Sequence, residues 1–320
     1  MVVYITFLKA LAACLITNAH YEGIYPTDLL ANGGLIGDIL FFAVSGYCLY
    51  RVKQPFVKWY AKRLWRVYPP VLLITAVYLL VGAYSLGEHS AAWWFVYPTY
   101  YHFVASILVL YIPYYIIVRT PCLRERLPLL MAVVALAWVV VYLTVYDRSY
   151  YHIDTVREPM IRFLFLESML LGAWFRQQDG RFRNRFHWLW PVGAAVCFAG
   201  YFASKLLFSR GLLPARYQLC NQIVIFALLF ALFGTFSGLD GKLSRLPDKL
   251  RRCVGFIADL TLEIYVVQYV LIWHIGPIGH FPLNWLALTA AILAAAYALH
   301  MVCKGFYKST GKIGRSITGR

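Results

Sequence analysis

Long apolar runs, separated only by short polar segments, dominate this chain. Hydrophobic residues make up 61% of its 320 positions, and charged residues only 14%. A membrane-spanning helix needs about 20 predominantly apolar residues, so this apolar content is enough for on the order of ten spans. A soluble chain of this length would need far more charge to cover its surface. The sequence therefore predicts an integral membrane protein.

The pattern predicts an all-α, polytopic membrane helix bundle with about ten transmembrane helices. The expected spans lie near residues 2–20, 35–50, 67–83, 97–118, 128–146, 160–176, 189–208, 217–237, 254–275 and 285–303. Pro98 and Pro113 interrupt the fourth span, so we expect it to be kinked or shortened. Residues 1–303 would form one membrane domain, followed by a basic tail at residues 304–320. No basic stretch precedes the first apolar run, so we expect no cleaved signal peptide.

The distribution of basic residues predicts that both termini lie in the cytoplasm. With that orientation, twenty-three of the 30 lysines and arginines fall in cytoplasmic segments, and only six fall outside. Retention of basic loops in the cytoplasm produces such a bias. An odd number of spans would break the alternation, so the bias also supports an even count.

The formal net charge of +16 does not predict nucleic-acid binding, because no soluble surface with groove-reading elements is visible. Topology and attraction to anionic membrane lipids account for the basic face. The seven cysteines show no spacing typical of a metal site, so we expect no metal.

Three ionisable residues near the start of the chain fall in expected spans. Lys9 lies near the middle of the first span, and His20 follows about 16 Å further along the helix, near its outer end. Asp38 opens the second span at a similar depth. A neutral imidazole near the outer water can accept a proton from a hydroxyl, and Asp38 can fix its tautomer. A single histidine at a helix end is more often a packing or capping residue, so the residues alone leave the role of His20 open.

Acidic residues also occur inside the expected spans, where charge is costly and often functional. Glu167 lies in the sixth span. Asp259 and Glu263 are one turn apart in the ninth, so we expect them on one helix face. An ion pair of Lys9 with Glu167 or Glu263 would be structural, and the residues favour that role for Lys9 over a catalytic one.

A basic segment precedes the third span. Arg63 and Arg66 are three positions apart, so they are neighbours on one helix face at the cytoplasmic surface. Two guanidinium groups so placed form a fork suited to phosphate oxygens, and Lys58 and Lys62 add charge. Contact with lipid phosphate explains the pair equally well.

Together these residues resemble acyltransferase family 3, a family of bacterial membrane acyltransferases. That family typically carries Arg-x10-His in its first helix, and this chain keeps the spacing with Lys9 and His20. Its Gly-rich turn and Phe-Phe…Ser-Gly stretch are matched at residues 37–47, and its Arg-x-x-Arg with an aromatic-Pro pair at residues 63–69. Weaker similarities lie at residues 102–113, 171–172 and 262–268.

Two positions depart from the family pattern. Lys9 stands where the family has Arg, and lysine cannot reproduce a bidentate arginine contact. Gln268 stands where many relatives have His.

The resemblance implies a membrane acyltransferase domain in residues 1–303, located in the bacterial cytoplasmic (inner) membrane. It implies transfer of an acyl group, usually acetyl from acetyl-CoA, to a hydroxyl of an extracytoplasmic glycan. His20 would be the general base or a transient acyl acceptor, and Asp38 would orient it. Lys9, or a nearby backbone group, would stabilise the oxyanion. Coenzyme A phosphates would be held by Arg63 and Arg66, with Lys58 and Lys62.

Weaker expectations concern the acceptor. The outer segment at residues 146–154 is polar and aromatic, which suits sugar stacking, and it contains Asp147 and His152. Glu167, Glu263 and Tyr265 are further candidates for contacts with the substrate.

Two other classes of function fit part of the pattern. A secondary transporter of a sugar or anion would also use intramembrane charges. However, we find no internal repeat, and a transporter would give Arg63 and Arg66 no special role. A non-catalytic assembly or lipid-binding subunit would give His20 no role.

Overall fold

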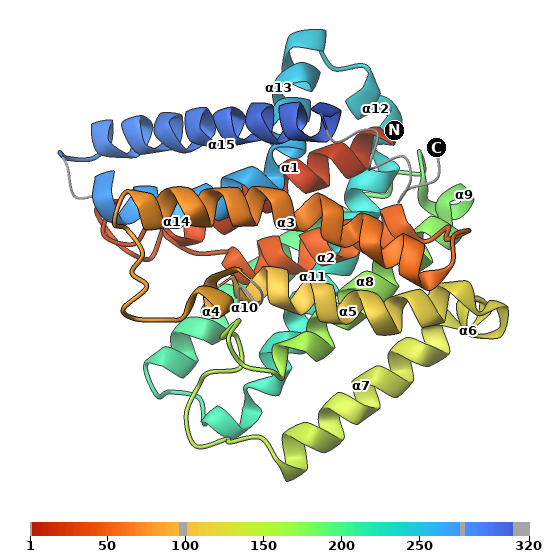
Figure 1. The fold of residues 1–320 in the computed structure, drawn as a ribbon. Coiled ribbons are helices and arrows are strands. Elements are labelled where there is room, and N and C mark those ends of the chain that lie inside the picture. The colour runs from red at the N-terminus through yellow and green to blue at the C-terminus, as the bar shows by residue number, and fades with distance from the viewer. Residues whose placement is uncertain (1, 96–100, 276–278, 310–320) are drawn as a thin grey trace. The chain divides into compact units, whose positions relative to one another are not determined.

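The computed structural model describes residues 2–95, 101–275 and 279–309, and every regular element in these ranges is helical (Figure 1). The longer helices are α1 (Val3–Ala19), α2 (Gly34–Leu49), α3 (Phe56–Leu80), α5 (His102–Arg119), α7 (Leu127–Thr144), α8 (Ile161–Gln177), α10 (Leu189–Ser209), α11 (Leu219–Gly238), α13 (Asp248–Asp259), α14 (Thr261–Ile275) and α15 (Leu283–Ser309). The short ones are α4 (Ala91–Phe95), α6 (Pro121–Glu125), α9 (Asp179–Phe182), the 3-10 helix Ala215–Tyr217 and α12 (Asp240–Ser244). Pro98, which was expected to interrupt the fourth span, lies outside the described residues.

Five helices of the described chain are long and apolar enough to cross a membrane. They are α5, α7, α10, α11 with the 3-10 turn before it, and α15. The pair α13 and α14 makes a sixth if it forms one bent span, and α1 and α2 are shorter apolar helices. The structure therefore confirms a helical multi-pass membrane protein, whereas the count of about ten spans stays a prediction.

The ninth expected span is not one straight helix. α13 and α14 meet at an angle of 69° on either side of Leu260. The hydroxyl of Thr261 donates a hydrogen bond to the carbonyl of Ala258 at 2.8 Å, so a side chain satisfies a carbonyl near the end of α13. The prediction that Asp259 and Glu263 share one helix face is wrong, because the bend separates them.

The third expected span begins earlier than predicted. α3 starts at Phe56 rather than near residue 67, so the basic segment is already helical. Pro69 and Pro70 lie inside this helix. Each removes one backbone N–H, so two carbonyls of the preceding turn have no helical donor.

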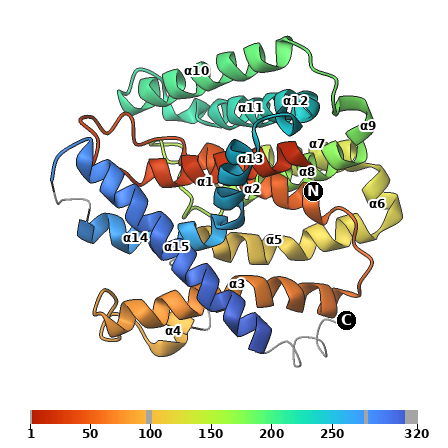
Figure 2. The ribbon, with the colours of Figure 1, turned by 90° about the horizontal axis from the view of Figure 1, so that it is seen from above.

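The chain divides into two compact units, and the division passes through α1, α5 and α13. Unit 1 contains residues 1–12, 35–52 and 112–255, and unit 2 contains residues 13–34, 53–111 and 256–320. In unit 1, α10 packs against α11, and α8 packs against both α7 and α11; Figure 2 shows α10 and α11 side by side. In unit 2, α14 packs against α3 and α15, and α3 also contacts α15.

Two glycines allow α2 and α8 of unit 1 to meet backbone to backbone. A Cβ atom on Gly172 would lie 1.8 Å from the carbonyl oxygen of Ala43, and one on Gly46 would lie 2.0 Å from that of Met169. Small residues permit such close approach of membrane helices. Both glycines belong to segments that resemble the family, and their role here is packing.

Candidate active site

His20 follows the last residue of α1, within unit 2. Its backbone N–H donates to the carbonyl of Thr17 at 3.1 Å, and its side chain is exposed. The imidazole meets the ring of Tyr269 edge to face, with ring centroids 6.5 Å apart and an interplanar angle of 83°. The position expected from the sequence, at the end of the first helix, is correct. Tyr269 is a neighbour that the sequence did not indicate.

A buried polar contact connects the end of α1 to α14 one turn below His20. The hydroxyl of Thr17 donates to the amide oxygen of Gln268 at 2.7 Å. Only 1% of Gln268 and 9% of Thr17 is exposed, so this bond is shielded from water. Gln268, noted as a departure from the family pattern, thus positions the helix that carries His20. Thr17 and His20 are three positions apart, so the sequence could have indicated that they lie on the same side of the helix end.

α3 connects to the same part of α14. The hydroxyl of Tyr78 donates to the carbonyl of Val267 at 2.8 Å, directly before Gln268 and Tyr269. The end of α1 and the second half of α3 therefore contact neighbouring residues of α14.

Arg63 and Arg66 lie on the first half of α3, also in unit 2. The guanidinium of Arg63 lies over the ring of Trp59, 5.7 Å from its centroid, and Arg66 is exposed. Lys58 and Lys62 are half-buried on the same helix. The structure thus brings all four predicted donor-binding residues onto one helix.

Arg66 precedes Tyr78 by twelve residues, a rise of about 18 Å along α3. Tyr78 contacts α14 next to the residues that contact Thr17 and His20. The arginine pair and His20 therefore lie at opposite ends of the helix group formed by α3, α14 and the end of α1. Both groups lie in unit 2, so this relation does not depend on the placement of unit 1.

An apolar cavity of about 710 Å³ borders α3 and α15 beside the arginine pair. Its lining is aliphatic and aromatic, and includes Leu64, Trp65 and Phe306. Such a lining suits a hydrocarbon chain rather than a phosphate. The phosphate-binding function expected of Arg63 and Arg66 therefore does not belong to this cavity.

Lys9 and Asp38 belong to unit 1, whereas His20 belongs to unit 2. Lys9 is half-buried on α1, and Asp38 is buried on α2 with 5% of its surface exposed. The orienting role of Asp38 and the oxyanion role of Lys9 stay predictions.

Glu263, suggested above as a partner of Lys9, binds a histidine in unit 2. The Nδ1 atom of His300 lies 2.8 Å from its Oε1 atom, which ties α14 to α15. Glu167 is buried in unit 1, and its Oε1 atom has no hydrogen-bond partner among the described residues. Tyr265 packs against the rings of Tyr101 and Phe103, with centroids 5.9 and 5.3 Å away.

The segment between α7 and α8 presents an aromatic stack. His152 lies between Tyr146 and Tyr150, with ring centroids 4.6 and 4.1 Å away. Tyr150 is 57% exposed, so one end of the stack faces outward. Asp147 accepts a hydrogen bond from the backbone of Ser149 at 2.9 Å, which lowers the pKa of this exposed carboxyl.

A buried carboxylate fixes this segment to α10 and α11. Asp154 accepts hydrogen bonds from Tyr201 at 3.0 Å and from Asn221 at 3.1 Å, and also from Tyr151 and Gln222. From the sequence, Asp154 was expected only as the last residue of the polar segment 146–154. It lies in a loop seven residues before the apolar helix α8, a common place for an aspartate, so no local signal marked it.

A family model described as an acyltransferase domain matches residues 2–301, which is nearly the whole chain. No curated protein and no solved structure gives a significant match. A match of this extent confirms the resemblance seen in the sequence. The chain therefore belongs to acyltransferase family 3, and it is a multi-pass membrane acyltransferase.

Proposed function

We propose that this protein moves an acyl group, acetyl in the first instance, from cytoplasmic acyl-CoA to a hydroxyl of an extracytoplasmic glycan. Family membership supports acyl transfer in general. One observation supports the specific proposal: His20 and the arginine pair lie at opposite ends of the helix group formed by α3, α14 and the end of α1 in unit 2. A donor and an acceptor on opposite sides of a membrane require a site whose two binding groups are separated along the helices in this way.

Arg63 and Arg66 hold the coenzyme A phosphates in this proposal. Guanidinium groups bind phosphate oxygens through paired N–H donors, and adjacent turns place the two groups on one side of α3. Lys58 and Lys62 add attraction without directional fit. The long, thin pantetheine arm then extends toward the end of α1, which brings the thioester near His20.

His20 acts as the general base. Its neutral imidazole takes the proton of the acceptor hydroxyl while the hydroxyl oxygen attacks the thioester carbonyl. The carbon–sulfur bond breaks, and the coenzyme A thiolate leaves and takes up the proton. Tyr269 supports the imidazole from one side at the end of α1. The family resemblance alone supports Asp38 as the group that orients the ring, and Lys9 or a backbone N–H as the group that stabilises the oxyanion.

The glycan acceptor contacts the aromatic stack between α7 and α8. Tyr150 and His152 present flat, partly exposed rings, which suit the apolar face of a sugar. Asp147 adds a hydrogen-bond acceptor for sugar hydroxyls. Glu167, Glu263 and Tyr265 have weaker support as substrate contacts. Glu263 contacts His300, and Tyr265 packs against two other rings.

The proposed topology has about ten spans with both termini in the cytoplasm of a bacterium, and the protein lies in the inner membrane. The bias of lysines and arginines toward one set of segments supports this orientation. The arginine pair is then cytoplasmic and His20 lies near the outer face.

The donor role is tested with purified protein in proteoliposomes, by measuring the release of free coenzyme A from acetyl-CoA. The variant Arg63→Ala/Arg66→Ala should raise KM for acetyl-CoA at least tenfold while the protein still folds. The matched control, Arg119→Ala/Arg124→Ala, removes two arginines from another basic segment and should leave KM unchanged. Equal effects of the two double variants would mean that the pair serves only topology or lipid contact. Uptake of sugar without acetyl-CoA would instead indicate a transporter.

A further inference from the structure

A second basic site lies in unit 1, outside the residues assigned to acyl transfer. A cavity of about 240 Å³ is lined by Val2, Ile5, Tyr47, Cys48, Arg51 and Arg176. Two of its six lining side chains are arginines, and no carboxylate lines it. All six residues belong to unit 1, so the cavity does not depend on the position of unit 2.

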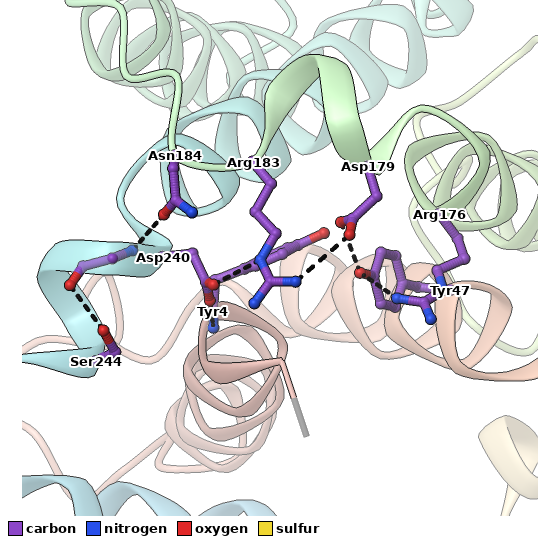
Figure 3. Close-up of polar contacts among 9 residues, drawn as sticks. Tyr4, Tyr47, Arg176, Asp179, Arg183, Asn184, Asp240 and Ser244 are labelled. Atoms are coloured by element: carbon purple, nitrogen blue, oxygen red, sulfur yellow. Dashed lines mark hydrogen bonds and ion pairs between the residues drawn. The ribbon is translucent and has the colours of Figure 1, made fainter.

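Arg176 is held in place by a tyrosine. Its Nη1 atom donates to the hydroxyl of Tyr47 at 2.9 Å, and its guanidinium carbon lies 5.1 Å from the centroid of the Tyr47 ring (Figure 3). An arginine has five N–H donors in a planar fork, and this contact uses one of them. The remaining donors are therefore oriented without being consumed by a carboxylate.

The carboxylates near this cavity are used by other groups. The hydroxyl of Tyr47 donates to Asp179 at 2.9 Å, and Arg183 lies 3.6 Å from Asp179 and 2.7 Å from Asp240. Asp240 also accepts the backbone N–H of Tyr4 at 2.9 Å. Figure 3 shows these residues in one row that ends at Arg176.

The two arginines of the cavity form no direct ion pair, although Asp179 attracts Arg176 from the far side of the Tyr47 hydroxyl. Within the described ranges, neither Arg51 nor Arg176 has a carboxylate oxygen within the 4.0 Å of an ion pair. Arg51 is exposed, so its side chain can change conformation, whereas Arg176 is half-buried and held by Tyr47. A fixed guanidinium beside an adjustable one suits an anion with several oxygens.

The size and lining of the cavity limit the size and chemistry of the ligand that it can bind. Cavities that enclose drug-sized ligands measure about 300–1,000 Å³, so this one takes a single group rather than a whole nucleotide. A phosphate offers tetrahedral oxygens to both arginines, and the Tyr47 hydroxyl lies beside Arg176. Val2 and Ile5 add an apolar wall, which suits the carbon chain of a phosphate ester.

We propose that Arg51 and Arg176, positioned by Tyr47, form a binding site for the phosphate group of a phosphate ester. The phosphate belongs either to a phospholipid headgroup or to a free, water-soluble phosphate compound. This site does not rest on the proposed acyl transfer, and it is separate in sequence and in unit from Arg63 and Arg66.

The test measures ligand-dependent thermal stability of the full-length protein, because a ligand that binds only the folded state raises its unfolding temperature. One arm adds inorganic phosphate to protein in neutral detergent, with chloride at equal ionic strength as reference. The other arm compares nanodiscs of phosphatidylcholine with nanodiscs that also contain phosphatidylglycerol. The general stabilising action of phosphate on folded proteins is shared by all variants, so only differences between variants count.

The wild type should show a larger stabilisation than Arg51→Gln/Arg176→Gln in at least one arm, with apparent affinity reduced at least tenfold in the variant. A difference in the phosphate arm identifies a soluble phosphate, and a difference only in the nanodisc arm identifies a lipid headgroup. The matched control Arg119→Gln/Arg124→Gln should behave as the wild type. If the double variant does not fold, Arg51→Gln alone is used, since this side chain is exposed and forms no ion pair. Equal stabilisation of wild type and variant in both arms would overturn the proposal.

Discussion

The hydroxyl of Tyr307, near the end of α15, donates a hydrogen bond to the backbone carbonyl of Trp65 at 3.2 Å. In an α-helix this carbonyl would accept the N–H of the fourth following residue, which here is Pro69 and has none. Pro70 likewise leaves the carbonyl of Arg66 without a backbone donor, and this carbonyl lies 3.4 Å from the same hydroxyl. The Tyr307 hydroxyl therefore replaces a missing backbone donor in the turn that carries the arginine pair.

Tyr307→Phe should destabilise this turn. The variant leaves a partly buried carbonyl without a donor, which costs about 1 kcal/mol or more. We expect a lower unfolding temperature in detergent and a higher KM for acetyl-CoA. Tyr297→Phe, on the same helix, is the control, because Tyr297 is 47% exposed. Indistinguishable behaviour of the two variants would show that the Tyr307 hydroxyl contributes nothing to the turn.

Gly172→Ala should disrupt the contact between α2 and α8. The added methyl group would overlap the backbone of Ala43, which cannot move without shifting the whole helix. Overpacking typically costs about 1–3 kcal/mol, and a backbone overlap of this depth should reach the upper end. Size-exclusion chromatography and thermal unfolding would measure the loss. Gly180→Ala is the control, since nothing lies within 4 Å of its new methyl group; equal stability of both variants would contradict the packing role.

Asp154 should make stability depend on pH. Burial raises the pKa of Asp154 above its ordinary value, and hydrogen bonds from groups such as Tyr151 and Tyr201 offset only part of this effect. The folded protein thus binds this proton more tightly than the unfolded chain. This contribution to stability falls as pH rises from about 4, the ordinary pKa of aspartate, through the raised pKa of the folded protein. Unfolding temperatures across this range should decline less in Asp154→Asn, and identical profiles would refute the assignment.

Glu263 and His300 should be energetically coupled. A double-mutant cycle with Glu263→Gln and His300→Gln, read from unfolding free energies, should give about 0.5–3 kcal/mol, as for groups in direct contact. The exposed pair Asp248 and Arg251 is the control, where about 0–1 kcal/mol is expected. Additive effects at Glu263 and His300 would mean that their contact does not hold α14 against α15.

Apolar length predicted the helices well, because a membrane helix needs little beyond a continuous apolar run. α1 begins at Val3 and ends at Ala19, and α10 spans Leu189–Ser209, each within two residues of the expected span. The bend at Leu260 was missed, since Thr261 within an apolar run gives no sign that its hydroxyl will cap the preceding helix. The early start of α3 was missed because its charges marked it as a loop.

The candidate site was predictable only in part. The spacing of Arg63 and Arg66 sets their relation on a helix, and the position of His20 follows from the length of α1. The partners of these residues come from distant segments, such as Tyr269 for His20, and tertiary packing decides them. The same holds for Glu263, whose carboxylate contacts His300, a partner that the sequence did not indicate.

The role of His20 is the central claim, and release of free coenzyme A tests it most directly. Proteoliposomes with the wild type, His20→Ala or the exposed control His187→Ala would receive acetyl-CoA and candidate extracytoplasmic glycans. We predict that His20→Ala lowers acceptor-dependent release at least a hundredfold, in line with loss of a general base, while its unfolding temperature and KM for acetyl-CoA stay unchanged. The control should keep full activity. Activity of folded His20→Ala close to that of the wild type would contradict the account.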